Sequence, residues 1–243
     1  MCLGSETNEL PRNKGRAVAV IPAAGAGIRM GREPAKQFVE LDNRPLLAVT
    51  LQPFQDCPAV DAIVLVVPGH DVDFCKRKIV EKFGLEKVQS VVSGGKRRQD
   101  SVRLGLEAIG SACGLVVIHD GARPLVDRTF IQRVVSAGRA HRAVITALPA
   151  KETVKSVNRH REVMRTIKRQ EVWLVQTPQV FRYEDIATAH LKAYREGWDE
   201  ATDDSSLIEK LGIPVTVIEG SERNIKVTTP YDLELARFLL SHP

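Results

Sequence analysis

The sequence predicts an α/β fold, an open and mostly parallel sheet flanked by helices, from which a β-hairpin arm protrudes. Short apolar runs alternate along the chain with amphipathic stretches, which is the pattern of β-α units. Several apolar runs are continuous, as expected for strands that helices cover on both faces. One segment, residues 149–171, interrupts this alternation with two short pieces of alternating polarity.

The apolar runs and the amphipathic stretches give the expected elements in order. Strands are expected at residues 17–21, 62–67, 88–92, 115–118, 143–148, 172–176 and 215–218. Helices are expected at residues 45–55, 72–83, 99–109, 128–141, 183–196, 203–211 and 230–241. Ligands of such sheets bind beyond the carboxyl ends of the strands. The loops that follow Ile21, Val92 and Ile118 are therefore the candidate binding loops.

The predicted arm consists of residues 153–157 and 163–167, which are separated by a polar turn. An isolated two-stranded hairpin is only marginally stable in water, so we expect this one to pack on something. It is either a solvated flap or an arm that meets a second subunit.

Composition narrows the class of protein. The 243 residues carry 43% hydrophobic side chains, which excludes a disordered chain, and no apolar run is long enough to span a membrane. Residues 1–16 are expected to form a flexible polar leader without the apolar core of a signal peptide, ahead of a single domain at 17–243. We expect a cytoplasmic protein.

Charge and the potential metal ligands narrow it further. The net charge of +5 comes without a basic tract interleaved with aromatic residues, so no nucleic-acid partner is expected; cations that face small phosphorylated substrates account for the charge. The four cysteines show no C-x-x-C pattern and are expected to be reduced thiols. The six histidines show no ligand spacing for a transition metal.

The most informative segment is VAVIPAAGAGIRMGREPAKQ, residues 18–37. A buried strand leads into a loop of small residues whose backbone N–H groups lie open, and Arg29 and Lys36 follow. This pattern indicates a phosphate-bearing ligand, although an ordinary glycine-rich turn would have the same residues. Gln37 after Lys36 excludes a P-loop, and Met30 excludes the dinucleotide fingerprint.

Two further loops carry polar residues at strand ends. Residues 93–102, SGGKRRQDSV, combine a glycine turn and three cations with a helix start; alone, this is more often an ordinary junction. In residues 119–124, HDGARP, Asp120 stands where a carboxylate binds Mg²⁺ or ribose. Arg123 either binds phosphate or neutralises Asp120, and His119 is expected to serve packing or hydrogen bonding.

Three later segments have plain structural interpretations. QTPQVF, residues 176–181, is expected to be a strand end and a turn. Thr202 is expected to cap a helix, whose first turn suits the two acids that follow it. Lys226 is expected in a short strand before Pro230, which suits the first turn of the last helix.

The order and spacing of seven elements identify a family. The chain resembles the 2-C-methyl-D-erythritol 4-phosphate cytidylyltransferases of the non-mevalonate isoprenoid pathway from about residue 18 to 240. The matching elements are PAAGAGIRMG with Lys36-Gln37, GGKRRQDSV, HDGARP, ETVK, QTPQVF, TDDSSLIE and NIKVTTPYDL. The resemblance implies a Rossmann-like nucleotidyltransferase fold that dimerises through the arm. It also implies that CTP and methylerythritol phosphate give the CDP-alcohol and pyrophosphate, with Mg²⁺.

The resemblance assigns roles where residues match. Arg29 and Lys36 fall on the cations that stabilise the transition state, and Arg169 and Lys226 on those that position the acceptor phosphate. Asp120 falls on the acid beside triphosphate, metal and acceptor. The implied cytosine contacts are Ala23, Ala24, Gly95 and Ser101, and Thr153 is an acceptor contact. Thr153 and Arg169 would reach the partner subunit's site. The other expected binding residues are Pro22, Gly25, Arg98, Gly121, Arg123, Thr177 and Thr202.

Two departures and three rivals stay open. The family's Pro-Lys-Gln is here Ala35-Lys36-Gln37 with Pro34 displaced, and its Asp-Thr is Glu152-Thr153, which leaves acceptor choice open. The nearest rival is a ribitol 5-phosphate cytidylyltransferase. Sugar-1-phosphate nucleotidyltransferases that use UTP or dTTP lack HDGARP followed by this arm. The last rival is a non-catalytic nucleotide-binding module.

Overall fold

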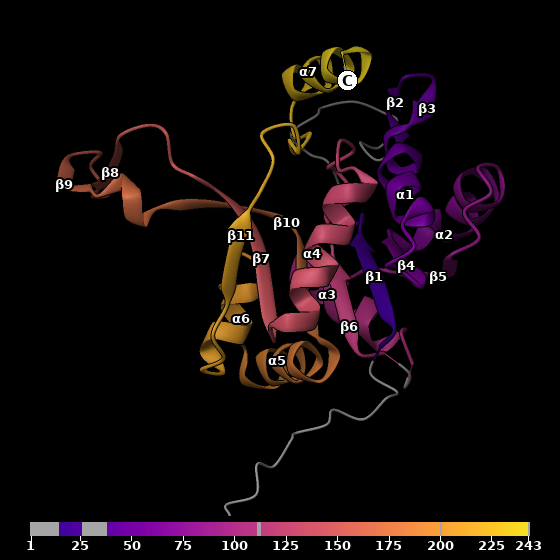
Figure 1. Cartoon of the computed structure of the whole chain (residues 1–243), viewed down its shortest axis with the longest axis horizontal. Helices are drawn as coiled ribbons and strands as arrows, with labels where there is room; N and C mark the ends of the chain where they lie inside the picture. Colours follow the sequence, from indigo (N-terminus) through magenta and orange to yellow (C-terminus); the bar gives the residue numbers. More distant parts are fainter. Residues whose placement is uncertain (1–14, 26–37, 111–112, 200, 243) are drawn as a thin grey trace, which may run out of the picture.

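The computed structural model describes residues 15–25, 38–110, 113–199 and 201–242 (Figure 1). The strands are β1 (Ala17–Pro22), β2 (Glu40–Leu41), β3 (Arg44–Pro45), β4 (Ala62–Val67), β5 (Val88–Ser93), β6 (Leu115–Ile118), β7 (Ala143–Pro149), β8 (Val154–Val157), β9 (Val163–Ile167), β10 (Trp173–Arg182) and β11 (Thr216–Glu219). The α-helices are α1 (Leu46–Asp56), α2 (Val72–Cys75), α3 (Arg98–Glu107), α4 (Arg128–Ala140), α5 (Tyr183–Glu196), α6 (Ser205–Lys210) and α7 (Pro230–Ser241). The described residues also form the 3-10 turns η3 (Gly69–Asp71) and η5 (Arg169–Glu171) and a π-helix, η4 (Lys76–Glu81).

The central sheet has seven strands in the order β11-β7-β10-β6-β1-β4-β5. All neighbours are parallel except β10, which runs antiparallel to both β6 and β7. Strands β8 and β9 form a separate hairpin that projects from the body (Figure 1). The predicted fold class, a mostly parallel sheet flanked by helices with a protruding hairpin, is confirmed.

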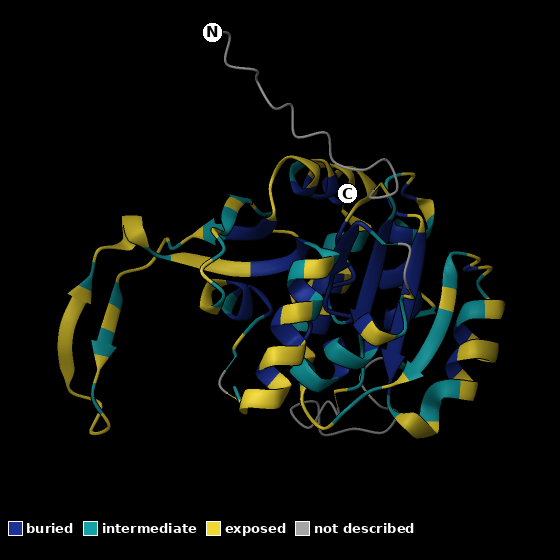
Figure 2. Ribbon diagram, turned by 90° about the horizontal axis from the view of Figure 1, so that it is seen from below, coloured by how far each residue is buried: buried dark blue, intermediate teal, exposed yellow. Residues whose placement is uncertain are grey.

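Helices cover both faces of the sheet because alternate residues of each central strand point to opposite sides. Ala19 and Ile21 of β1 join a cluster with α1 and α4, whereas Val18 and Val20 join a cluster with α3, α5 and α6. Figure 2 shows the inner strands of this central sheet buried and the arm largely exposed, whereas the edge strands β5 and β11 are only partly covered. No helix in the described part of the chain is both long and apolar enough to cross a membrane.

Local sequence signals start two of the helices. The Asp127 side chain accepts a hydrogen bond from the Phe130 amide at 2.7 Å and caps α4. Thr229 and Asp232 form a capping box around Pro230 at the start of α7. The sequence analysis did not foresee the β2–β3 hairpin, whose turn places Asp42 and Asn43 at positive φ, a conformation that these residue types tolerate.

The structure corrects three expectations. QTPQVF is no turn: β10 continues through it, with a register shift between Gln176 and Val180 that accommodates Pro178. Thr202 caps no helix; α6 begins at Ser205, and Asp203 accepts the hydrogen bond from the Ser206 amide. Lys226 lies in a loop and not in a strand.

Two helices also differ from expectation. The predicted helix 72–83 divides into α2 and the π-helix η4, and the predicted helix 203–211 is shorter at both ends. Residues 1–14 of the expected leader lie outside the described residues, and the single-domain boundary remains a prediction.

Candidate functional site

The three predicted binding loops meet at the carboxyl edge of the sheet. The Ala23 amide donates to the Val66 carbonyl at 2.7 Å, and the Gly121 amide donates to the Pro22 carbonyl at 3.1 Å. The Gly94 amide donates to the Val67 carbonyl at 2.8 Å. Backbone hydrogen bonds therefore place the loop after β1 between the loops that follow β5 and β6.

Glycine is required where these loops touch. A Cβ atom on Gly94 would lie 2.4 Å from the Ala24 Cβ and 2.8 Å from the Ser101 Oγ. A Cβ atom on Gly121 would lie 2.8 Å from the Ala23 Cβ. All three separations are too short for real atoms, so only glycine permits this packing.

Ser101 orders the loop that follows β5. Its hydroxyl accepts a hydrogen bond from the Gly95 amide at 3.2 Å and donates one to the Arg97 carbonyl at 3.1 Å. The side chain is buried, and it lies at the start of α3. Ser101 thus shapes the loop from within, and its predicted contact with cytosine stays a prediction.

We expect Gly94→Ala to weaken CTP binding about tenfold or more while the protein stays folded. The added methyl group pushes Ala24 and Ser101 apart, and a misplacement near 1 Å can cost up to about 10²-fold in activity. Titration calorimetry with CTP measures the effect. Gly15→Ala is the matched control, because a Cβ atom there meets nothing within 4 Å. Equal CTP affinity of the two variants would contradict the packing argument.

Asp120 is the centre of the site's charge. It is 7% exposed and follows β6 directly after His119. Its Oδ1 accepts a hydrogen bond from the Arg98 Nε at 2.9 Å, and its Oδ2 lies 2.8 Å from the Lys226 Nζ. The Arg123 Nε lies 3.6 Å from the same Oδ2. Two segments distant in sequence, together with the loop of Asp120 itself, therefore bring cations to one carboxylate.

The charges set the protonation of the cluster. Burial opposes ionisation of Asp120, but Arg98 and Lys226 outweigh it and hold the pKa of this carboxyl well below its usual range. Burial lowers the pKa of His119 to about 4, so its imidazole is neutral at neutral pH. Three cations therefore surround the single carboxylate of Asp120, an arrangement suited to a polyanionic ligand.

Asp204 joins the charged cluster through Arg98, and the sequence analysis did not single it out. It is 1% exposed, and its Oδ2 lies 2.8 Å from the Arg98 Nη1. Its Oδ1 lies 3.1 Å from the Nε2 of His190, which is also buried. Burial opposes its ionisation, but Arg98 outweighs this effect and lowers the pKa of the Asp204 carboxyl. Arg98 is thereby held between two acids. The sequence does show two adjacent acids in TDDSS, residues 202–206. The start of a helix is enough to explain them, so they do not by themselves indicate a buried ion pair.

A second set of hydrogen bonds ties the loop of Lys226 to the site. The Arg123 Nη1 donates to the Asn224 carbonyl at 2.7 Å, and the Asn224 Nδ2 donates to the Thr177 carbonyl at 2.7 Å. The Val227 amide donates to the Ala122 carbonyl at 2.8 Å. These bonds hold the loop in place, so Lys226 reaches Asp120 although it does not lie in a strand. The Lys226 side chain keeps 39% exposure, so its ammonium group can meet a ligand.

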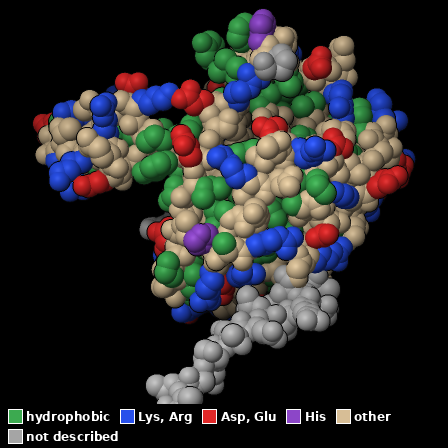
Figure 3. All heavy atoms as spheres, in the orientation of Figure 1, with side chains coloured by type: hydrophobic (Ala, Val, Ile, Leu, Met, Phe, Trp, Pro, Cys, Tyr) green, Lys and Arg blue, Asp and Glu red, His purple; other side chains and the backbone are tan. Residues whose placement is uncertain are grey.

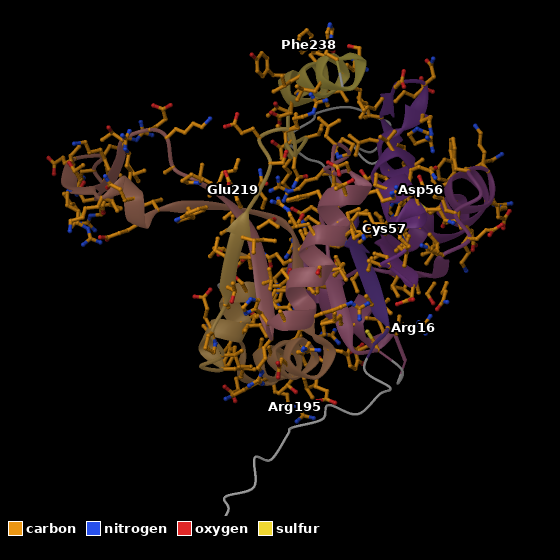
Figure 4. The ribbon with its side chains drawn as sticks, in the orientation of Figure 1. Arg16, Asp56, Cys57, Arg195, Glu219 and Phe238 are labelled. Atoms are coloured by element: carbon orange, nitrogen blue, oxygen red, sulfur yellow. The ribbon has the colours of Figure 1, made fainter. Side chains whose placement is uncertain are left out.

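The arm residues do not join this cluster within one chain. Thr153 and Arg169 are exposed, and the Arg169 Nη1 donates to the Lys151 carbonyl at 3.0 Å. Lys151 in turn pairs with Glu222, just after the Glu219 labelled in Figure 4 at the end of β11. No hydrogen bond or ion pair among the described residues joins Thr153 or Arg169 to Asp120 or Lys226. Arg29 and Lys36 lie outside the described residues.

The donor set suits Mg²⁺ only in part. Mg²⁺ is commonly bound by one or two carboxylates together with substrate phosphates. Asp120 offers one such carboxylate at the edge of the loops, and no group of three His, Cys, Asp or Glu residues that could hold a metal occurs in residues 15–25, 38–110, 113–199 and 201–242. The described residues therefore offer one carboxylate, whose two oxygens face Arg98 and Lys226, and no all-protein cage.

Comparisons with known proteins cover nearly the whole chain. The model of the 2-C-methyl-D-erythritol 4-phosphate cytidylyltransferase family matches residues 17–242. An enzyme of that name from Alkaliphilus oremlandii is 42% identical over 229 residues, which cover 94% of this chain and 96% of the relative. Another from Desulforamulus reducens is 46% identical, with 93% and 96% covered.

Solved structures agree in fold. The 4-diphosphocytidyl-2C-methyl-D-erythritol synthase of Anaerococcus prevotii superposes with a TM-score of 0.82 at 34% identity, covering 94% of this chain and 97% of that one. The 2-C-methyl-D-erythritol 4-phosphate cytidylyltransferase of Thermus thermophilus gives a TM-score of 0.73 at 34% identity, covering 92% and 98%.

Proposed function

This chain belongs to the 2-C-methyl-D-erythritol 4-phosphate cytidylyltransferase family, and we infer that it joins CTP to 2-C-methyl-D-erythritol 4-phosphate. The products are 4-diphosphocytidyl-2-C-methyl-D-erythritol and pyrophosphate, in isoprenoid precursor biosynthesis. The observation that carries this inference within the structure is the set of cations around Asp120, where three glycine-containing loops meet.

We propose that the loops divide the substrates between them. Backbone groups of residues 22–25 and of Gly95 enclose the cytosine, and Ser101 holds the second loop in place. The triphosphate then extends toward Asp120, beside Gly121 and Arg123. Lys226 faces the acceptor phosphate. Close packing at Gly94 brings the two loops together, and we propose that the pocket they form is small enough to favour a pyrimidine ring over a purine.

The chemistry that these residues must support is electrostatic. The acceptor phosphate attacks the α-phosphorus of CTP in line, a P–O bond forms, and pyrophosphate leaves with the electrons of the broken bond. The phosphate is already ionised at neutral pH, so no general base is required. Two unit charges about 4 Å apart interact by roughly 4 kcal/mol at an effective dielectric constant near 20. Cations held ready at the transferring group therefore lower the barrier.

We assign Lys226 to the acceptor phosphate from its position beside Asp120, and propose that Arg29 and Lys36 stabilise the charge that develops at the α-phosphate. Asp120 would hold Mg²⁺ together with the phosphates of CTP, and the ion would add positive charge there. Arg98, fixed by Asp120 and Asp204, keeps the carboxylate aligned. The roles of Thr177 and Thr202 in binding stay predictions; Thr177 accepts a hydrogen bond from the Asp120 amide at 3.0 Å.

We propose a homodimer in which the arm of each chain completes the partner's site through Thr153 and Arg169. Hydrophobic side chains gather where the arm joins the body (Figure 3). Trp173, Leu174 and Val175 are 42%, 58% and 43% exposed at the start of β10. An exposed apolar patch beside an arm is typical of an interface between subunits.

Mixing two inactive variants tests the exchange of arms. Lys226→Ala and Arg169→Ala are each expected to be nearly inactive. A hybrid dimer then carries both changes in one site and none in the other, so random association restores about a quarter of wild-type sites. Initial rates after mixing and subunit exchange measure the recovery. Rates that stay at the sum of the two separate variants would show that Arg169 acts within its own chain.

The reaction itself is tested by pyrophosphate release, coupled through pyrophosphatase. Release is expected from CTP only when 2-C-methyl-D-erythritol 4-phosphate is present, with UTP, ATP and ribitol 5-phosphate at least about tenfold slower. Equal turnover with ATP would contradict the small pocket. Faster turnover with ribitol 5-phosphate would reassign the acceptor and leave the cytidylyl transfer intact.

We propose the cytoplasm as the compartment. Cys57, Cys75 and Cys113 are free thiols, which suits a reducing compartment.

A further inference from the structure

His119 lies fully buried behind the site, directly before Asp120, and the mechanism above does not use it. Both of its ring nitrogens have partners. The Nε2 lies 3.1 Å from the Arg123 carbonyl oxygen, and the Nδ1 lies 3.2 Å from the Thr177 Oγ1. Two residues predicted to bind substrate therefore contact one imidazole on opposite edges.

The chemistry of the partners fixes the direction of each hydrogen bond. A carbonyl oxygen only accepts, so the Nε2 of the neutral ring carries the hydrogen and donates to Arg123. The Nδ1 is then an acceptor, and it takes the hydrogen of the Thr177 hydroxyl. The oxygen of that hydroxyl is left to accept from the Asp120 amide, 3.0 Å away. One tautomer satisfies every group in this chain of bonds.

These bonds reach both charges at the centre of the site. Through Thr177 the imidazole determines the place of the Asp120 backbone, and through the Arg123 carbonyl it closes the turn in which the Arg123 amide donates to the Asp120 carbonyl at 3.0 Å. The Thr177 carbonyl accepts from Asn224, two residues before Lys226. A shift of His119 would therefore move the carboxylate relative to the lysine.

We propose that His119 is a positioning residue for cytidylyl transfer, which aligns Asp120 through Thr177 and through the carbonyl of Arg123. The inference rests on the proposed function of the site. The alternative is that His119 only fills space in the core, since its ring also packs against Phe54, with the two ring centroids 5.0 Å apart. Packing depends on ring volume, whereas positioning depends on the two nitrogens.

Two variants separate these roles. His119→Phe keeps an aromatic ring of similar size and removes both hydrogen bonds. Phe54→Leu loosens the contact with the ring and leaves both bonds in place. Steady-state kinetics with CTP and 2-C-methyl-D-erythritol 4-phosphate give kcat and both KM values, and thermal unfolding measures stability alongside.

The expected result is a fall in kcat of about tenfold or more for His119→Phe, with the KM for CTP changed less than about threefold. Phe54→Leu is expected to keep kcat within about twofold of wild type. A folded His119→Phe enzyme with wild-type kcat would overturn the proposal, and so would equal losses of kcat in both variants.

His119→Asn and His119→Gln keep the test decisive if His119→Phe fails to fold. The asparagine amide can replace the acceptor near Nδ1, and the glutamine amide can replace the donor near Nε2. We expect His119→Asn to retain more kcat than His119→Gln, because the Thr177 bond leads to the Asp120 amide. Wild-type kcat in both variants overturns the proposal. A wild-type enzyme without turnover in this assay would reject the proposed function instead.

Discussion

Lys226→Ala is expected to lower kcat/KM for 2-C-methyl-D-erythritol 4-phosphate by about 10²-fold or more, the typical cost of removing one preorganised group that stabilises a transition state. The lysine is half-exposed beside a buried carboxylate, and it is the described cation best placed to meet the incoming phosphate. Asp120 keeps Arg98 and Arg123 in the variant, so the fold should survive. Initial rates at varied concentrations of 2-C-methyl-D-erythritol 4-phosphate measure kcat/KM.

Lys78→Ala is the matched control for this variant. It removes the same charge from an exposed position on η4 and is expected to stay within about twofold of wild type. If Lys226→Ala remains within tenfold of wild type while folded, the acceptor phosphate binds elsewhere.

Arg98→Gln is expected to lower the free energy of unfolding by about 3 kcal/mol, because it removes the cation that two buried carboxylates share. Asp204 is the more deeply buried of the two. For a chain of this size the loss corresponds to roughly 6–12 °C in Tm, measured by calorimetry. Turnover should fall as well, since Asp120 loses one of its two close partners.

Arg103→Gln controls for the helix position. Arg103 lies on α3 like Arg98, but its partner Glu107 is largely exposed, so the expected cost is about 1 kcal/mol or less. Equal losses of Tm in the two variants would show that the buried ion pairs do not determine the stability effect of Arg98. A double variant with Asp204→Asn should recover part of the loss, since neighbouring partners couple.

The effect of Arg98→Gln also depends on pH in a defined direction. The folded-state pKa of Asp120 and that of Asp204 are lowered, so their contribution to stability is present above the unfolded value, near pH 4. It is lost as the pH falls through the folded values. The difference in unfolding free energy between wild type and variant should therefore be constant at neutral pH and shrink in acid.

Much of the fold could be predicted because the central strands are continuous apolar runs. Four of the expected strands in the parallel part of the sheet agree with β1, β4, β5 and β6 to within about one residue. The sequence predicts that this strand ends at Gln176, because proline and polar residues usually mark a turn, whereas β10 continues to Arg182. Tertiary pairing with β6 and β7 overrides that local signal at the bulge.

The loops of the site could be predicted from the sequence, but the ion pairs between distant segments could not. The glycine loops and Asp120 follow apolar strands, and parallel strands bring their carboxyl ends together. The link from Asp204 to Arg98 joins segments far apart in the chain, and nothing local distinguishes a capping acid from a buried one. Lys226 reaches Asp120 through backbone bonds in a loop, which periodicity does not reveal.

The structure of the protein with a non-hydrolysable CTP analogue and Mg²⁺ tests the central claim most directly. The account predicts the cytosine against the backbone of residues 22–25 and Gly95, with the α-phosphate beside the Asp120 and Lys226 pair. A nucleotide bound away from these three loops, with that ion pair untouched by any phosphate, would contradict it.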